Sequence, residues 1–240
     1  MCNRYNIKGQ PADVAEFFHA TLRPFDFKQG DVFPGGLAPG ILLDEDGQRF
    51  IEPMQFGLAK PKAKTPFDRR YPNNNARVEK CDKWPWADSF KKRRCIIPLS
   101  AMHESCWWGK AAGQKVYFRA TDVEYLGVAS IFSIWRNPKS NEQLFTMTFL
   151  MRPASEFIME HGHHRQPFFL DEEGFNDWMH PGERSPDELK RVLRNCAAQP
   201  DWAVEIESEL KSFAKNSKAR SAKRDEQLEA IAESGLPLGI

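Results

Sequence analysis

YLGVASIFSIW at residues 125–135 is the strongest strand signal in this 240-residue chain, because branched and aromatic side chains fill it. LFTMTFLM at residues 144–151 has a similar composition, and turn-forming Gly, Asp, Asn or Pro residues bound both runs. Two shorter runs of the same kind, 95–99 and 116–119, precede them. Together these segments predict a mostly antiparallel, barrel-like sheet.

Turn residues and helical patterns complete the expected fold. Turn-forming Gly and Pro residues at 34–40 precede short apolar runs, as is typical of a β-rich fold. Ser185, Pro186 and Glu188 supply an N-cap, a proline in the first turn and a capping-box glutamate for one helix. Helices are predicted at residues 11–22, 154–159, 171–179 and 185–193. We therefore expect an α+β protein with a single domain, built on a twisted, barrel-like antiparallel β-sheet with peripheral helices.

A formal net charge of +1 and a hydrophobic content of 41% limit the classes of protein and partner. The apolar content suffices for one substantial core, placed at residues 1–204, followed by a charged helical tail at 205–240. The chain is no polycation, so contact with nucleic acid depends on local clusters of Lys and Arg. The five cysteines never form CxxC and no run is long enough to span a membrane, so we expect a cytoplasmic monomer, nucleoid-associated if bacterial.

Cys2 directly follows the initiator Met1, and a residue this small permits removal of the initiator. The new terminus then carries a free α-amine and a free thiol on neighbouring carbons. The amine condenses with an aldehyde to an imine, and the thiol closes a five-membered thiazolidine ring on it. An aldehyde is therefore the natural partner, although the position alone also suits an ordinary residue at a frayed terminus.

Three further segments hold polar residues that their surroundings do not explain. Asn75 ends the run of three asparagines at 73–75, which taken alone is typical of a solvated turn. Glu104 lies where a strand ends beside apolar residues, so it is either a surface glutamate or a buried carboxyl whose pKa is raised towards neutrality. His163 belongs to a cluster of three histidines that suits acid–base chemistry or a plain surface. Neither a spaced Cys pair nor an HExxH helix accompanies them, so no metal is expected.

These motifs together resemble one protein family. They follow the order and approximate spacing of the SOS-response-associated peptidase (SRAP) family: MCNRY at 1–5, LAPG at 37–40, NARVE at 75–79, RCII at 94–97 with HE at 103–104, and HHRQP at 163–167. The resemblance implies a barrel-like antiparallel sheet with flanking helices. It also implies shielding of abasic sites in DNA, through a thiazolidine between the terminal cysteine and the ring-opened sugar. The family is further credited with self-cleavage that exposes the cysteine.

The resemblance implies roles for individual residues. Glu104 would manage the amine and imine protons, His163 would act as general acid and base on the sugar and in crosslink release, and Asn75 would orient Cys2. DNA contacts are expected from four residues: Arg4, Pro39, Arg77 and Arg165. The expected partner is single-stranded DNA containing an abasic site, where the sugar is accessible without breaking a stack. No cofactor is expected.

Some positions depart from the family pattern. Phe56 stands where a Trp is usual before Gly57, and Ser105 replaces an aromatic residue after the glutamate. Trp107 and Trp108 are close enough in sequence to supply an apolar wall instead. We expect no C-terminal strand after Glu205, because a basic, alanine-rich tail stands in its place.

Two other classes of function use the same residues. A cysteine-dependent N-terminal-nucleophile peptidase or amidohydrolase would also combine Cys2 with a histidine and an amide, and it would need an oxyanion hole. A non-catalytic nucleic-acid-binding module would instead use Arg77, Arg165 and the basic clusters at 91–94 and 211–224. Cys2 would be dispensable in such a module.

Overall fold

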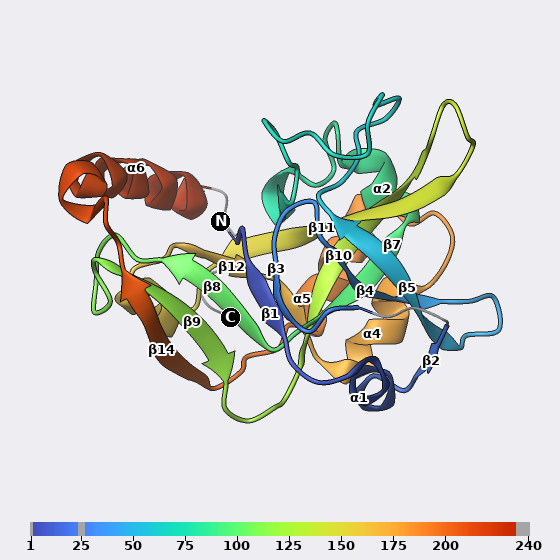
Figure 1. Ribbon diagram of the computed structural model, residues 1–240, viewed down its shortest axis with the longest axis horizontal. Coiled ribbons are helices and arrows are strands. Elements are labelled where there is room, and N and C mark those ends of the chain that lie inside the picture. The colour runs from blue at the N-terminus through green and yellow to red at the C-terminus, as the bar shows by residue number, and fades with distance from the viewer. Residues whose placement is uncertain (1, 24–26, 234–240) are drawn as a thin grey trace.

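A five-stranded barrel forms the centre of the computed structural model, which describes residues 2–23 and 27–233 (Figure 1). Antiparallel pairing runs from β11 through β10, β7 and β4 to β5, and a parallel pairing of β11 with β5 closes the ring. The barrel strands are β4 (Leu37–Leu43), β5 (Arg49–Phe56), β7 (Arg94–Leu99), β10 (Leu126–Arg136) and β11 (Gln143–Pro153). The predicted barrel-like, mostly antiparallel sheet is confirmed, and the strands expected from YLGVASIFSIW and LFTMTFLM are the two longest.

Short strands extend the edges of the barrel. Two of them, β6 (Asn75–Arg77) and β12 (Arg165–Pro167), both pair with the end of β11. Their registers place Arg77 beside Met151 and Arg165 beside Pro153, so two segments far apart in sequence meet on one strand. The remaining edge strands are β2 (Ala20–Leu22) beside β5, and β13 (Phe169–Leu170) beside β10.

A second sheet stands beside the barrel and carries the start of the chain. Its strand order is β14-β9-β8-β1-β3. The strands are β1 (Tyr5–Ile7), β3 (Gly30–Val32), β8 (Ala101–Ser105), β9 (Gln114–Ala120) and β14 (Trp202–Glu209). Only Ser100 separates β7 of the barrel from β8, and Tyr5 pairs with Met102 across β1 and β8. Glu104 is thereby placed on the strand next to the N-terminal one.

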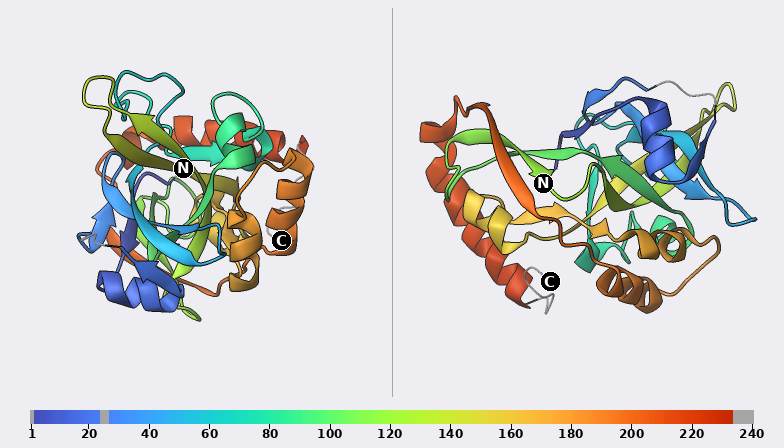
Figure 2. Two further views of the ribbon diagram at one scale, coloured as in Figure 1. Left: turned by 90° about the vertical axis from the view of Figure 1, so that its right-hand side faces the viewer. Right: turned by 90° about the horizontal axis from the view of Figure 1, so that it is seen from below.

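The helices are peripheral, as expected (Figure 2). They are α1 (Pro11–Phe17), α2 (Ala87–Lys92), α3 (Glu156–His161), α4 (Glu172–Met179), α5 (Pro186–Asn195) and α6 (Phe213–Glu233), with a 3-10 turn at Val78–Lys80. The capping box of α5 forms as predicted. The Ser185 hydroxyl accepts from the Glu188 backbone amide, and the Glu188 carboxylate accepts from the Ser185 backbone amide. No helix in the described ranges is long and apolar enough to cross a membrane.

Two expectations about element boundaries are wrong. The helix predicted over 11–22 ends at Phe17, because His19 adopts a left-handed φ of 49° and the chain continues as β2. The tail expected from Glu205 is not all helix either. Residues up to Glu209 belong to β14, which pairs with β9, and α6 begins only at Phe213. A C-terminal strand is therefore present.

Aromatic packing fixes the N-terminal strand against the barrel. Tyr5 is fully buried, and its ring lies 5.2 Å from that of Phe56 and 4.9 Å from that of Phe149, centroid to centroid. Phe56 and Phe149 belong to the two strands whose parallel pairing closes the barrel. Aromatic pairs at such distances add about 0.5–1.5 kcal/mol each beyond the burial of their area. Tyr5 thus ties the chain start to the barrel closure, three residues after Cys2.

Candidate active site

Two asparagine side chains hold the backbone of Cys2. The Nδ2 groups of Asn74 and Asn75 donate to the Cys2 carbonyl oxygen over 3.0 and 2.9 Å, and Asn74 also donates to the Asn3 side chain at 2.9 Å. Asn75 starts β6, which β11 fixes in register, so its side chain is anchored by the barrel. Asn75 therefore contacts the Cys2 backbone, and its role in orienting Cys2 stays a prediction. Asn74, which the asparagine run alone would place in a solvated turn, makes a second hydrogen bond to the same carbonyl oxygen.

Cys2 is fully buried in this arrangement. Its thiol donates to the Arg4 carbonyl at 3.3 Å. Burial, and next the nearby Glu104 carboxyl, hold the pKa of the Cys2 thiol well above its ordinary value. The thiol is therefore protonated at neutral pH, and it needs a base before it acts as a nucleophile.

Glu104 and His163 form a buried pair beside this cysteine. Glu104 is 5% exposed and His163 is likewise 5% exposed, and His163 Nε2 lies 3.1 Å from Glu104 Oε2. His163 Nδ1 lies 2.6 Å from the Arg165 carbonyl oxygen, which only accepts. Nδ1 must therefore carry the proton of the neutral ring, and Nε2 becomes the acceptor. A protonated Glu104 completes the pair by donating to Nε2.

Burial sets the proton balance of this pair. It raises the pKa of Glu104 to about 7 and lowers the pKa of His163 well below its ordinary value. Both shifts favour the uncharged forms, in agreement with the hydrogen-bond geometry. A carboxyl with a pKa near neutrality can accept and return a proton at working pH. Of the two alternatives that the sequence left open for Glu104, the structure shows the buried carboxyl and not the surface glutamate.

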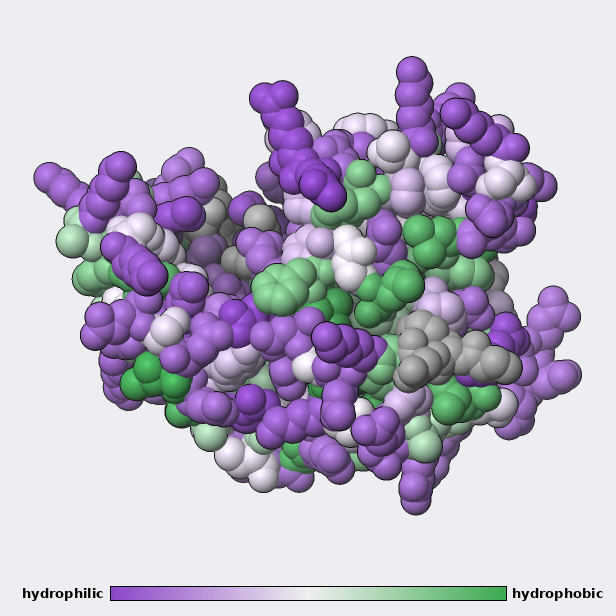
Figure 3. Space-filling view, viewed as in Figure 1, coloured by the Kyte–Doolittle hydropathy of each residue, from purple (hydrophilic) through white to green (hydrophobic). Residues whose placement is uncertain are grey.

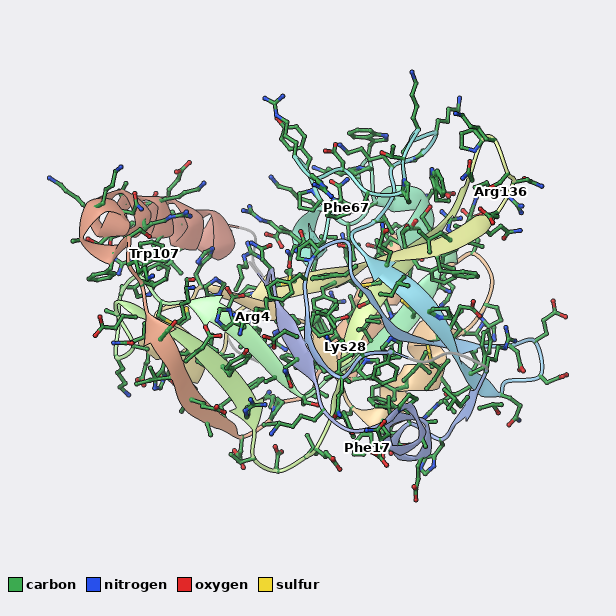
Figure 4. The ribbon with its side chains drawn as sticks, in the orientation of Figure 1. Arg4, Phe17, Lys28, Phe67, Trp107 and Arg136 are labelled. Carbon is green, nitrogen blue, oxygen red and sulfur yellow. The ribbon has the colours of Figure 1, made fainter. Side chains whose placement is uncertain are left out.

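A cavity of about 300 Å³ gives access to the pair. Asn3, Glu104 and His163 line one side of it, and Trp107 and Trp108 form an aromatic wall. The side of the cavity away from the barrel is closed by α6, beneath which Trp107 is seen in Figure 4. Cys2 is fully buried and does not line the cavity, whereas its neighbour Asn3 does. The apolar wall expected from the two tryptophans is therefore present.

The arginines expected to bind DNA are engaged by acidic side chains. Arg4 donates to Asp31 at 2.7 Å and also pairs with Glu207 of β14. Arg165 is 2% exposed and makes a two-pronged ion pair with Glu79, in which Nη1 lies 3.0 Å from Oε2. Both guanidinium groups therefore already have acidic partners, and for the buried Arg165 the loss of Glu79 would leave an uncompensated charge, which is costly. Phosphate binding by Arg4 or Arg165 stays a prediction. Each guanidinium would have to contact a phosphate and its carboxylate partner at the same time.

Arg77 and Pro39 complete the set of predicted site residues. Arg77 is half-buried on β6, two residues from Asn75, on the strand that holds Cys2. Pro39 is buried within β4 and pairs in register with Pro53 of β5. The structure thus brings Cys2, Asn75, Glu104 and His163 together, with Arg77 close in sequence to that group, and places Pro39 inside the barrel wall.

Comparison with known proteins agrees with the motifs. The family model described as SOS response associated peptidase (SRAP) matches residues 1–212. The abasic site processing protein YoqW of Bacillus subtilis is 27% identical over 230 residues, covering 90% of this chain and 97% of that protein. The abasic site processing protein HMCES of Gallus gallus is 26% identical over 183 residues, covering 65% of this chain and 54% of that protein.

Solved structures share the fold. A crystal structure of a protein from Bordetella bronchiseptica superposes with a TM-score of 0.69 at 18% identity, covering 86% of this chain and all of that one. A protein from Bacteroides thetaiotaomicron gives the same TM-score and identity, covering 89% of this chain and 94% of its own. At this identity the likeness supports the architecture alone.

Proposed function

Because the chain belongs to the SOS response associated peptidase (SRAP) family, we propose that it captures abasic sites in DNA through Cys2. The relatives named abasic site processing proteins support this class of substrate. One observation carries the proposal. Asn74 and Asn75 hold the first residues of the chain beside a buried Glu104–His163 pair that opens on a cavity.

The chemistry begins after Met1 is removed. The α-amine of Cys2 adds to the C1′ aldehyde of the ring-opened sugar, and loss of one water gives an imine. The Cys2 sulfur then bonds to the same carbon while the thiol proton goes to the imine nitrogen, so the ring closes without further loss of atoms. The thiol pKa is high, so Glu104 takes that proton and returns it to nitrogen. His163 transfers protons at the sugar during ring opening and crosslink reversal.

The substrate is a single strand. An abasic sugar in a single strand reaches the cavity without the cost of breaking a base stack. Contacts to phosphates rather than to bases suit a protein that recognises a missing base in any sequence, and Arg77 of β6 would supply one. The protein acts as a monomer in the cytoplasm under this proposal.

A direct test uses the mature protein, with loss of Met1 verified by intact mass. We expect a heat-stable adduct with an oligonucleotide that carries an abasic aldehyde, and none with one that carries a tetrahydrofuran analogue lacking the aldehyde. An N-terminal-nucleophile amidohydrolase would hydrolyse amides and form no DNA adduct. A non-catalytic module would bind intact and abasic strands equally and also leave no adduct.

His163→Ala should slow release of the crosslink more than it weakens DNA binding. The ring that accepts from Glu104 and is fixed by the Arg165 carbonyl would be lost, and with it the group that returns a proton to the sugar. General acid–base groups typically contribute about 10²–10⁴ in rate. The measurement is a time course of adduct reversal together with the affinity for the tetrahydrofuran strand. Wild-type reversal in the variant would remove His163 from the mechanism.

A further inference from the structure

The cavity has a wall that the family match does not include. The family model ends at residue 212, and α6 begins one residue later at Phe213. Three α6 side chains nevertheless line the same cavity as Glu104 and His163; we call Arg220, Lys223 and Arg224 the α6 cations. The helix lies at the opposite end of the molecule from α1, over the open side of the second sheet (Figures 1 and 2).

Aromatic contacts hold α6 in this position. The ring of Phe213 stacks on that of Trp107 with centroids 6.3 Å apart, and the Leu210 amide donates to the Gly113 carbonyl at 2.7 Å just before the helix. The Arg220 guanidinium lies 5.2 Å from the centre of the Trp107 ring, and that of Arg224 lies 5.4 Å from the centre of the Trp108 ring. Stacking of this kind orients a guanidinium and leaves its edge N–H groups available to a ligand.

The charge around the cavity is strongly one-sided. Positions 220, 223 and 224 have the i, i+3, i+4 spacing that places side chains on one helix face, where like charges repel. The lining side chains include the three α6 cations, one carboxyl, that of Glu104, and Arg4, whose charge Asp31 and Glu207 balance. Arg224 pairs with its neighbour Asp225, whereas neither Arg220 nor Lys223 forms an ion pair within the described part of the chain. A bound polyanion would relieve this repulsion.

We infer that the α6 cations bind the phosphate backbone of the DNA strand next to the reacting sugar. This inference rests on the proposed function, because the Glu104–His163 pair in the same cavity places the abasic sugar there. The phosphates that flank a sugar in the cavity must pass its walls, and the α6 wall carries Arg220 and Lys223, which have no ion-pair partner among the described residues. The surface of α6 is hydrophilic, and the molecule is hollowed between α6 and the loops above the barrel (Figure 3).

The test compares two variants with equal loss of charge. The cavity variant is Arg220→Gln/Lys223→Gln/Arg224→Gln, and the matched control is Lys211→Gln/Lys215→Gln/Lys218→Gln, whose residues are exposed and do not line the cavity. Affinity for a single strand with a tetrahydrofuran abasic analogue is measured over a series of salt concentrations. Each phosphate contact contributes roughly 0.7 to the slope of log affinity against log salt on single strands. We expect the cavity variant to lose roughly 2 from that slope and the control to keep most of it.

A third variant separates the effect of the positive charge from the effect of stacking on the tryptophans. Arg220→Lys/Arg224→Lys keeps the charge and weakens the stacking on the tryptophans, and it should retain a slope close to wild type. Equal slopes for the cavity variant and wild type would overturn the inference. So would faster adduct formation by the cavity variant, because α6 would then obstruct the strand rather than bind it.

The outcome is independent of the test of the proposed function. If wild type forms no adduct but the cavity variant loses the salt slope, α6 binds DNA and the Cys2 chemistry is wrong. If all proteins form adducts and all slopes agree, the Cys2 chemistry stands and the role of α6 is wrong.

Discussion

Cys2→Ser should reduce the heat-stable adduct with abasic DNA to background while leaving the protein folded. The serine hydroxyl can donate to the Arg4 carbonyl as the thiol does at 3.3 Å, and the two asparagines hold only the backbone carbonyl of residue 2. The α-amine remains, so an imine still forms, but the hydroxyl is a far weaker nucleophile and closes no stable ring. The variant should therefore give an adduct only when borohydride traps the imine.

Controls distinguish the amine from the thiol. Cys196→Ser removes a half-buried thiol that does not line the cavity, and it should leave adduct formation unchanged. Wild-type protein with an acetylated α-amine should give no adduct with or without borohydride, since no imine can form. A heat-stable adduct from Cys2→Ser without reductant would mean that another nucleophile attacks the sugar.

The barrel was predictable from sequence because its strands are dense in branched and aromatic residues. β10 and β11 were located to within a residue or two, and the capping box of α5 was found from three side chains. β14 was missed because its sequence, WAVEIESE, has an exposed face rich in acidic residues. Its last five residues are exposed, so the strand presents little buried apolar surface, and its pairing with β9 is a tertiary contact that the local sequence does not reveal.

The candidate site was easier to predict than its charged surroundings. Taken alone, Asn75, Glu104 and His163 also suited a turn or a plain surface, and the family motifs at 1–5, 75–79, 103–104 and 163–167 singled them out together with Cys2. The partners of the arginines carry none, because Glu79 and Glu207 reach Arg165 and Arg4 only through strand pairing. The sequence predicts the α6 cations only as part of a charged helical tail, or of a basic cluster at 211–224 in a nucleic-acid-binding module. Tertiary contacts such as the packing of Phe213 on Trp107 bring them to the cavity.

Glu104→Gln should slow adduct formation by about 10²–10⁴, the usual contribution of a general acid–base group. The amide can still donate to His163 Nε2, so the variant imitates the protonated carboxyl and keeps the local hydrogen bonds. It has no form that accepts the thiol proton. The ratio of wild-type to variant rate should therefore grow as pH rises through about 7, where the carboxyl of the wild type ionises. Comparing rates at several pH values cancels the titration of the α-amine, which both proteins share.

The stability of the wild-type fold relative to the variant should fall as pH rises, whereas its relative rate of adduct formation should grow. Glu104 has a folded pKa of about 7 against an ordinary value of 4.5, so folding favours its protonated form. The wild type therefore loses stability relative to the variant as pH rises from 4.5 to 7, by up to about 3 kcal/mol at 1.36 kcal/mol per pKa unit. Chemical denaturation at pH 5 and pH 8 measures this, and Glu124→Gln, an exposed site, serves as the matched control. If the wild type loses stability in this way but its rate relative to the variant does not grow with pH, Glu104 has a structural role only. A protein that shows neither effect would mean that the carboxyl is not buried as a neutral acid, and the proton route from sulfur to nitrogen would have to begin elsewhere.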